Sequence, residues 1–421
     1  MSKRLTATTL ALFIMAAPAL AQAVDEPPAP TPAFKGQTGA PAARTASSYT
    51  VETVISRLAQ PWSFDFLPDG RIIVSQFEGT MRIVDPKTQR YTAPLKGVPG
   101  VKMVSAEGLH DILLDPDFVH NRYVYFTYFK PPEGEAPGGW PASHFYDEVY
   151  AMSVAERRSK DLGSEVAARG RLSEDETRLE DVEVILTGGD RRLAFAPDGT
   201  LYVTGADRFR FYDSDLDGAE HDFDDPDTRR NYSGRVSRIN PDGSIPEDNP
   251  FIERSGVPWD TFSYGHRDPE GAAINPKTGE LWTVEHGPRG GDELNIIRAG
   301  RDYGWPVISY GRQYDLKPVG IGKQAHEGME QPVYYWYPSI APGGLMFYTG
   351  DRFPDWKGDL FVGAMAGQHL VRLRLDGDKV VAEEKLLTDL HQRIRTVRQG
   401  PDGYIYVSTD SGSILRLVPE K

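Results

Sequence analysis

The sequence predicts an all-β fold, a six-bladed β-propeller, from three observations. A turn resembling Pro-Asp-Gly recurs at six places along the chain. Each turn joins two short segments rich in β-branched and aromatic residues, as in a hairpin. Further apolar strands such as TMRIVDP, HLVRLRLDG and SILRLVP often follow, so each unit fits one four-stranded blade. A β-sandwich or two small barrels is the alternative, but these do not usually repeat one turn signature at such intervals.

The folded part is expected to span residues 49–421. Its six units begin at Phe64, Asp111, Arg192, Ala272, Met346 and Val397. Two insertions interrupt them. Residues 131–187 contain a charged, helix-compatible run that is expected to form an elaborated loop and the outer strands of the second blade, and residues 209–231 are an acidic insertion.

The beginning of the chain predicts export. Lys3 and Arg4 precede an apolar run over residues 5–20, and Ala21-Gln22-Ala23 is a small-x-small cleavage site. Residues 1–23 therefore read as a signal peptide, because the apolar run is too short to span a bilayer. Residues 24–48, rich in Ala, Pro and Thr, are expected to form a flexible leader. The predicted location is periplasmic or secreted.

Composition narrows the partners. The chain has 61 acidic and 47 basic residues, a formal net charge of −14 and no cysteine. This charge repels nucleic acid and anionic membrane, and it favours cations and neutral solutes. No disulfide can hold the fold, so its stability is expected to come from a packed core and from bound metal.

The segment from Glu285 to Pro306, EHGPRGGDELNIIRAGRDYGWP, is a candidate cation site. Its glycines allow main-chain oxygens to converge, while Glu285, Asp292 and Glu293 offer the oxygen ligands that Ca²⁺ prefers. A tight surface loop with solvated charges is the alternative interpretation.

The acidic insertion offers a second candidate calcium loop. Asp213, Asp215, Asp217, Gly218 and Asp224 match the spacing Asp-x-Asp-x-Asp-Gly-x₅-acid. The alternate acidic positions face one pocket, but Asp224 replaces the longer glutamate that usually ligates from that position. A solvated acidic loop remains the alternative, because no strong amphipathic helices flank this segment.

Several longer stretches together resemble the glucose/sorbosone dehydrogenase family, soluble six-bladed propellers that include PQQ-dependent aldose sugar dehydrogenases. The stretches are PWSFDFLPDG, GRVSRINPDGSIPEDNPF, SYGHRDPEGAAINP, EHGPRGGDELN, DYGWP and QRIRTVRQGPDGYIYV. The resemblance runs from about Pro61 to the end of the chain. It implies a PQQ- and calcium-dependent oxidoreductase that acts on an aldose or related alcohol and passes electrons to a further acceptor.

The resemblance also implies particular metal ligands. The carbonyls of the EHGP motif that hold the cofactor's Ca²⁺ fall on Gly287 and Pro288, and a second, structural Ca²⁺ would use Glu293 and Tyr303. These residues are expected to lie near the mouth of the central channel.

The implied cofactor contacts follow from the same motifs. Arg393 and Arg395 of the RIR segment correspond to the arginines that contact the carboxylates of PQQ, which suits their planar donor forks. Tyr334 and Tyr337 fall where the family stacks aromatic rings on its cofactor, although they are equally suited to stack on a sugar or to pack in the core. Arg267 lies in a further cofactor-binding segment.

The sequence departs from the family where the redox chemistry lies. Gly188 or Gly189 stands near the position of the catalytic histidine, Ala106 replaces a cofactor glutamine and Ala366 replaces a cofactor lysine. The family's Arg-Asn-Pro-Gln reads Arg267-Asp268-Pro269-Glu270 in this chain, which adds negative charge beside an anionic cofactor.

Other side chains are candidates for chemistry at the mouth. His110, His266 and Arg267 are expected to open inner strands and face the channel, where a histidine acts as a base or a metal ligand. A structural role is the alternative for each histidine. Arg208 is a candidate for binding a substrate carboxylate, with a solvated arginine as the alternative.

Three hypotheses for the function follow. The first is the PQQ- and calcium-dependent oxidoreductase with a rearranged base. The second is a non-redox lyase, epimerase or hydrolase in which Ca²⁺ polarises a substrate oxygen and a histidine moves the proton. The third is a carbohydrate-binding propeller without catalysis. In each, the expected partner is a small molecule.

Overall fold

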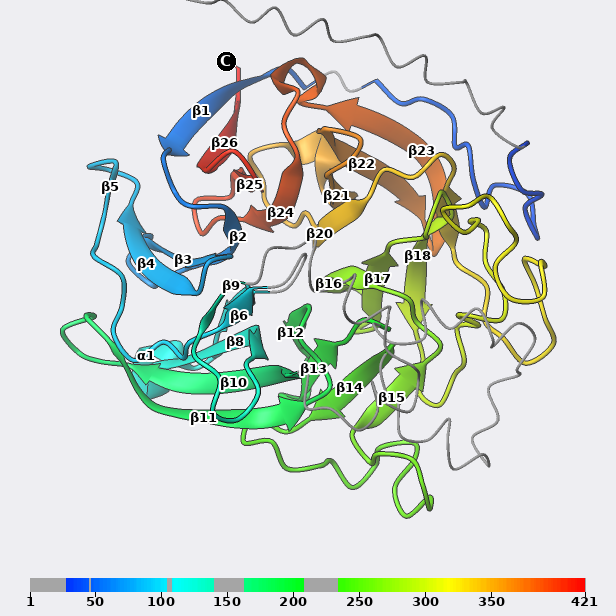
Figure 1. Cartoon of the computed structure of the whole chain (residues 1–421). Coiled ribbons are helices and arrows are strands. Elements are labelled where there is room, and N and C mark those ends of the chain that lie inside the picture. The colour runs from blue at the N-terminus through cyan, green and yellow to red at the C-terminus, as the bar shows by residue number, and fades with distance from the viewer. Residues whose placement is uncertain (1–27, 45–46, 104–107, 140–162, 208–233, 421) are drawn as a thin grey trace, which may run out of the picture.

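The structure, a computed structural model, describes residues 28–44, 47–103, 108–139, 163–207 and 234–420. Six four-stranded antiparallel sheets stand around a common axis, as Figure 1 shows. The predicted six-bladed β-propeller is therefore confirmed.

Each blade runs from an inner strand near the axis to an outer strand at the rim. Blade 1 contains β2 (Pro61–Phe66), β3 (Ile72–Gln76), β4 (Thr80–Asp85) and β5 (Arg90–Tyr91). Blade 2 contains β7 (Leu109–Leu114), β8 (Tyr123–Lys130), β10 (Ser164–Leu172) and β11 (Leu179–Thr187). Blade 3 contains β12 (Leu193–Phe195), β13 (Leu201–Thr204), β14 (Arg235–Ile239) and β15 (Thr261–Tyr264).

The remaining blades follow the same order. Blade 4 contains β16 (Pro269–Ile274), β17 (Leu281–Glu285), β18 (Asp292–Ile297) and β19 (Tyr334–Trp336). Blade 5 contains β20 (Pro342–Phe347), β21 (Leu360–Ala364), β22 (His369–Asp376) and β23 (Lys379–Leu386). Blade 6 contains β24 (Ile394–Gln399), β25 (Ile405–Thr409), β26 (Ser413–Pro419) and, at its outer edge, β1 (Tyr49–Ile55).

Strand β1 closes the ring. It precedes blade 1 in sequence but pairs antiparallel with β26, with Tyr49 opposite Pro419. The first strand of the domain thus completes the last blade, and opening the ring requires breaking this pairing.

The Pro-Asp-Gly-like turns connect inner strands to their neighbours. Gly70, Gly199 and Gly403 in these turns have φ of 86°, 85° and 79°, a backbone region that favours glycine. The recurring glycine therefore reverses the chain after an inner strand at one end of the propeller.

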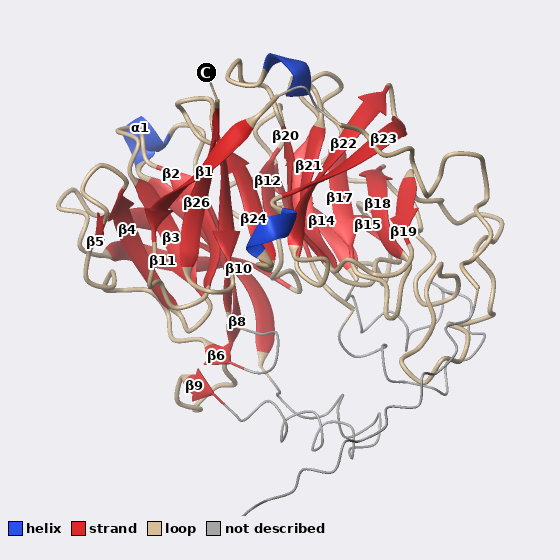
Figure 2. Cartoon of the chain, turned by 90° about the horizontal axis from the view of Figure 1, so that it is seen from above, coloured by secondary structure: helices blue, strands red, loops and turns tan. Residues whose placement is uncertain are grey.

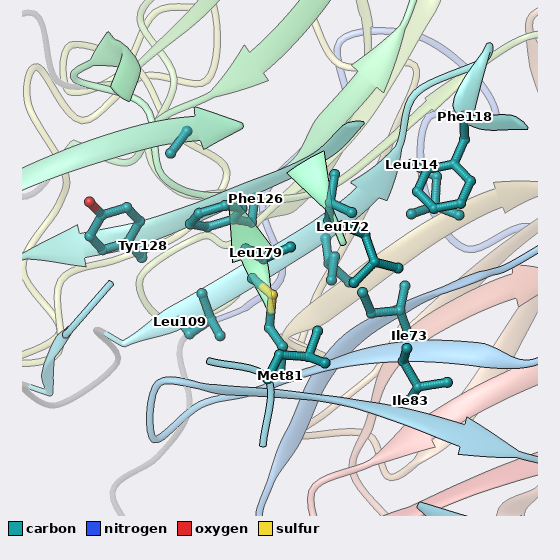
Figure 3. Packing of buried hydrophobic residues seen from close by; sticks show 14 of the residues in the cluster. Ile73, Met81, Ile83, Leu109, Leu114, Phe118, Phe126, Tyr128, Leu172 and Leu179 are labelled. Atoms are coloured by element: carbon teal, nitrogen blue, oxygen red, sulfur yellow. The ribbon is translucent and has the colours of Figure 1, made fainter. Parts of the chain in front are cut away.

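Apolar side chains fill the space between neighbouring blades. Between blades 1 and 2, Ile73 and Met81 pack against Leu109, Phe126 and Leu172, all fully buried (Figure 3). Burying one such side chain contributes about 1.5–3 kcal/mol. The packing between sheets, with no disulfide, is what holds the blades in a ring.

The segment over residues 131–187 contributes both a loop and strands. Its part from Ser164 onward forms β10 and β11, not a helix. Before it, the short parallel pair of β6 (Lys102–Met103) and β9 (Gly138–Gly139) projects from one end of the propeller, as Figure 2 shows. Residues 140–162 lie outside the described ranges.

Helices are few and short in the described part of the chain. They are α1 (Phe118–Asn121) and the 3₁₀ turns η3 (Pro354–Trp356) and η4 (Thr388–Leu390). None of these has the length or hydropathy to cross a bilayer.

Residues 28–44 do not form the flexible leader that their composition predicts, because they are docked on blades 4 and 5. The side chain of Gln37 is fully buried and donates to Pro332 O at 3.0 Å. Ala43 N donates to Glu383 O at 2.7 Å, and Tyr335 N donates to Gln37 O at 2.8 Å. Backbone and amide hydrogen bonds hold this segment, and such bonds cannot be predicted from composition.

The predicted signal peptide lies among residues 1–27, outside the described ranges.

Candidate functional site at one mouth of the propeller

The inner strands of five blades meet around one buried guanidinium, that of Arg192. Its Nε donates to Glu270 O at 2.6 Å, its Nη2 to Arg395 O at 3.2 Å and its Nη1 to Asp111 Oδ1 at 3.3 Å. The guanidinium carbon lies 3.9 Å from the ring centre of Trp62. Burial lowers the pKa of Arg192 to about 10, so it remains charged at neutral pH. This contact set joins β2, β7, β16 and β24 to the start of β12 and forms the floor of the mouth.

Two arginines of the RIR segment stand at this mouth. Arg395 donates to Asp410 through Nε at 2.6 Å and Nη2 at 3.0 Å, and Arg393 donates to the same carboxylate at 2.8 Å. Burial disfavours the ionised form of Asp410, but the two guanidiniums outweigh it and lower its pKa. The Arg393 and Arg395 side chains are 44% and 21% exposed, so the pair presents two positive charges against one carboxylate.

A second ionic cluster surrounds Arg191. Its Nη1 lies 3.1 Å from Asp190 Oδ2, and its Nε lies 3.0 Å from Asp268 Oδ1 and 3.3 Å from Glu270 Oε1. Three carboxylates from two blades therefore converge on one arginine that is 3% exposed. Asp268 and Glu270 therefore both have an ion-pair partner in Arg191.

His110 lies beneath the mouth and not at its surface. Its side chain is fully buried, with Nδ1 2.7 Å from Asp190 O, and its ring lies 5.0 Å from that of Trp62 and 6.2 Å from that of Phe77. Its neighbour Asp111 faces the other way along the strand, toward Arg192. Aromatic cover thus separates His110 from solvent.

His266 is likewise buried. Its Nε2 lies 2.9 Å from Ser263 Oγ, and its ring stacks on Tyr303 with 4.4 Å between centres. The next residue, Arg267, donates from Nη1 to His286 O at 2.8 Å, and its guanidinium lies 5.5 Å from the Trp305 ring centre. Both residues precede β16 and shape the wall of the mouth.

His286 and Asp268 form a partly exposed pair, with side chains 18% and 22% exposed. His286 Nε2 lies 2.8 Å from Pro342 O, which only accepts hydrogen bonds, so Nε2 carries the proton in the neutral ring. Nδ1 then faces Asp268 Oδ2 at 3.6 Å. Burial opposes ionisation of Asp268, but the neighbouring cations, chiefly Arg191, outweigh it and lower its pKa. In this state the two atoms are both acceptors and do not form a hydrogen bond, while protonation of either one would make them an attractive pair.

A small cavity beside this pair contains the candidate cation ligands. Glu285 on β17 and Glu293 on β18 are directly opposite in register and line it together with Gly287 and Tyr303. The cavity has a volume of about 10 Å³, which is enough for about one water molecule or ion. Burial, and then the adjacent Glu285, raise the pKa of Glu293 well above its ordinary value. No group of three or more His, Asp or Glu side chains arranged for a metal occurs in the described ranges, so this site depends on two carboxylates and backbone carbonyls.

The third acid of the segment, Asp292, holds the loop and is not free to bind a metal. Its Oδ1 accepts from Gly287 N at 2.9 Å, and its Oδ2 accepts from Ile340 N at 2.7 Å and Ala341 N at 2.9 Å. The loop is also tightly packed, because a Cβ on Gly291 would lie 2.2 Å from Gly311 N. Gly287 and Pro288 are both buried in this loop, which fixes the direction of their carbonyls.

The three candidate tyrosines lie in different places. The Tyr303 hydroxyl donates to Ile296 O and accepts from Arg298 N, so an oxygen ligand from this residue would be its backbone carbonyl. Tyr334 does not reach the mouth, because it is on outer strand β19 and its hydroxyl donates to Glu383 on β23. The ring of Tyr337 covers Gly290 of the EHGP loop, where a Cβ would lie 2.4 Å from it.

Five predicted site residues lie outside the described ranges. They are Arg208, Asp213, Asp215, Asp217 and Asp224. The second candidate calcium loop therefore has no structural description.

The sequence interpretation missed Asp190, Arg191, Arg192 and Asp410. Arg191 and Arg192 immediately precede the inner strand of the third unit. In a propeller, this position places a side chain at the channel mouth, so two adjacent arginines there were an available signal.

The chain matches the sequence model of the Glucose / Sorbosone dehydrogenase family over residues 58–416. The chain belongs to this family. Its likeness to the aldose sugar dehydrogenase YliI of Escherichia coli is 35% identity over 386 residues, covering 89% of this chain and 94% of the relative. The family relationship supports a sugar oxidoreductase in general terms.

Solved structures agree with this assignment. The apo-form of the soluble aldose sugar dehydrogenase from Escherichia coli is 33% identical, with a TM-score of 0.74, and the match covers 89% of this chain and all of that one. The PQQ-bound form of an aldose sugar dehydrogenase from Streptomyces coelicolor is 25% identical, with a TM-score of 0.63, covering 89% of this chain and 99% of that one.

Proposed function

We propose that this chain is an exported aldose sugar dehydrogenase that uses PQQ and Ca²⁺. The observation that carries the proposal is the pair Arg393 and Arg395, which share the carboxylate of Asp410 at the channel mouth. Two planar guanidiniums with one carboxylate between them suit a ligand that has carboxylates of its own. When bound, PQQ would supply the two-electron acceptor for oxidation of the sugar hydroxyl.

The donor set beside the mouth suits a hard cation. Glu285 is buried and Glu293 is half-buried directly opposite it, and two such adjacent carboxylates do not readily both ionise without a positive charge nearby. Ca²⁺ prefers carboxylate and carbonyl oxygens, and Gly287 and Tyr303 line the same cavity. We assign Glu293 and the carbonyls of this loop to a calcium site.

Oxidation of a hydroxyl also requires a group that takes its proton. Gly188 and Gly189 stand near the position of the family's histidine and offer none, while His110 and His266 are buried. The partly exposed pair of His286 Nδ1 and Asp268 Oδ2 fulfils the requirement, because one added proton converts two facing acceptors into a charge-assisted hydrogen bond. We assign this pair as the proton acceptor.

Reconstitution tests the cofactor. Apo-protein titrated with PQQ in the presence of Ca²⁺ is expected to show a saturable absorbance change and then to reduce a dye with one or more sugars of an aldose panel. Arg395→Gln removes a bidentate partner and is expected to weaken PQQ binding at least about tenfold. Arg374→Gln, at an exposed position on β22, serves as the control. An unchanged absorbance together with no dye reduction contradicts the proposal.

Asp268→Asn tests the proton acceptor, because it leaves the size of the side chain and removes its charge. Sugar turnover at neutral pH is expected to fall about 10²-fold or more, and the shape of the pH–rate profile is expected to change because the proton-accepting pair is broken, while PQQ affinity is unchanged or higher. The pH–rate profile of dye reduction checks this. Asp378→Asn is the control, and a scaled but otherwise unaltered pH profile would assign Asp268 a structural role.

The Arg191 cluster favours one second candidate, a non-redox enzyme on the same propeller. Three carboxylates and an arginine at the mouth suit proton transfer on a substrate held by Ca²⁺. Turnover of a sugar without PQQ or dye, abolished by chelation of calcium, would select this function.

A further inference from the structure

Residues 28–44 form a strap across blades 4 and 5, and Gln37 is its fully buried side chain. The Gln37 amide donates from Nε2 to Pro332 O at 3.0 Å. The Tyr310 hydroxyl shares its proton between Gln37 Oε1, at 3.0 Å, and Gln331 Oε1, at 2.6 Å. Burial of an amide is unfavourable unless the amide is hydrogen-bonded, so these contacts tie the strap to the segment that contains Tyr310.

The strap also holds Tyr310 through a second tyrosine. The ring of Tyr310 stacks on that of Tyr335 with 4.1 Å between centres, and both side chains are buried. Tyr335 donates from its backbone N to Gln37 O and from its hydroxyl to Pro30 O, both at 2.8 Å. The strap therefore contacts Tyr310 directly and also fixes the ring against which Tyr310 stacks.

The backbone around Tyr310 packs against the EHGP loop, residues 285–291. Arg289 and Arg312 exchange two backbone hydrogen bonds, at 3.0 Å and 3.2 Å. A Cβ on Gly291 would lie 2.4 Å from the carbonyl carbon of Tyr310, so the two backbones approach as closely as glycine allows. A shift of the Tyr310 segment would therefore also shift the loop.

The EHGP loop has one support at each end. Asp292 accepts from Gly287 N at 2.9 Å and fixes the beginning of the loop. The pairing of Arg289 with Arg312 fixes its return. Pro288 lies between these two supports, so the direction of its carbonyl depends on both.

The segment that supplies the second support is otherwise held by bonds within itself. Ser309 N donates to Lys323 O at 3.1 Å, and Gln313 N donates to Lys317 O at 2.9 Å. These bonds shape the segment but do not tie it to a blade. The contacts of Tyr310 with the strap and with Tyr335 provide that tie.

We propose that Gln37 is a positioning residue for the calcium site. It holds Tyr310, and the Tyr310 segment holds the return of the EHGP loop, whose carbonyls would bind the ion. The inference rests on the proposed function, which assigns calcium to these carbonyls and to Glu293. A loop that is ordered before binding loses less conformational entropy when the ion binds, so the strap raises the affinity for calcium.

Calcium calorimetry on the full chain and hydrogen exchange of the calcium-free chain test the proposal together. Gln37→Met keeps the length of the side chain and removes its hydrogen bonds, and Tyr310→Phe keeps the ring and removes its hydroxyl. Each variant is expected to raise the calcium Kd at least about fivefold and to speed amide exchange in residues 286–292, with exchange in β25 unchanged. Lys35→Met, at an exposed position of the strap, should change neither.

Two further variants make the test specific. Glu293→Gln identifies the part of the calorimetric signal that comes from this site. The double variant Gln37→Met/Tyr310→Phe is expected to bind calcium no more weakly than the weaker of the two single variants, because both changes break the same connection. Effects that multiply would show that the strap acts by a route other than Tyr310 and would overturn the proposal.

Three other results overturn the proposal and leave the proposed function intact. They are an unchanged calcium Kd in Gln37→Met whatever its melting temperature, unchanged exchange in residues 286–292, and faster exchange in all blades, which would mean that the strap only stabilises the fold. Absence of a calcium signal that depends on Glu293 in the wild-type chain would contradict the calcium site itself, and the role of Gln37 would fall with it.

Discussion

Asp111→Ala is expected to lower the free energy of unfolding by about 3–5 kcal/mol, because it leaves the buried guanidinium of Arg192 without its carboxylate partner. Asp111 is 1% exposed. It accepts from Ser63 Oγ of blade 1 at 2.5 Å, from Leu193 N of blade 3 at 2.9 Å and from Arg398 of blade 6 at 3.4 Å. One side chain from blade 2 thus joins three other blades at the axis. Urea unfolding followed by tryptophan fluorescence measures the change in the free energy of unfolding.

Two further variants make this result specific. Asp111→Asn keeps the shape of the side chain and one acceptor oxygen. Its free energy of unfolding is therefore expected to lie between those of wild type and Asp111→Ala. Asp378→Ala removes an exposed carboxylate from the β22–β23 turn and is expected to change stability by less than about 0.5 kcal/mol. A loss below about 1 kcal/mol for Asp111→Ala would show that the axial network does not hold the ring.

The propeller was predictable because its signal is local and repeated. The glycine turns and the alternating strands appear in short windows such as FAPDGTLYV, around Gly199, and the repeat supplies the architecture. The N-terminal segment gave no such signal. Gln37 and the backbone amides of residues 28–44 bind blades 4 and 5. A composition rich in Ala, Pro and Thr does not indicate where main-chain hydrogen bonds are made.

The site was only partly predictable because side-chain direction depends on neighbours in other blades. The EHGP loop and the RIR arginines are contiguous motifs, and the structure places both at one mouth. His110, by contrast, occupies an inner strand as expected but is covered by Trp62 and Phe77. Tyr334 lies one residue from a similar aromatic side chain, and strand alternation points it toward Glu383 between blades 4 and 5. Neither side-chain orientation can be predicted from the segment that contains the residue.

The acidic replacements at the mouth show the same dependence. Asp268 and Glu270 appear in the sequence as added negative charge beside an anionic cofactor. In the structure both contact Arg191, which is distant in sequence and occupies the position before another basic residue. The two acids therefore share an ion-pair partner from a different blade, and only the three-dimensional arrangement reveals this contact.

Glu293→Gln is expected to abolish stabilisation by calcium while making the calcium-free protein more stable at neutral pH. Burial and Glu285 raise the pKa of Glu293 above its ordinary value of 4.5, so the folded chain holds this proton more tightly than the unfolded chain. Between the two pKa values the folded state binds more protons, and the stability of the calcium-free chain must fall as pH rises. Glutamine is neutral and removes both that decline and the charge that attracts the ion.

Thermal melting between about pH 5 and pH 8, in chelator or in excess calcium, measures both effects. In wild type, calcium competes with the proton on Glu293, so its stabilising effect is expected to grow with pH and to reach about 2.7 kcal/mol when free calcium is about 100 times Kd. Glu327→Gln, at an exposed position, should retain the full response. The same calcium shift in Glu293→Gln as in wild type would exclude Glu293 as a ligand. Loss of the calcium response without the gain in calcium-free stability would contradict the raised pKa of Glu293, because removing its charge would then relieve no repulsion.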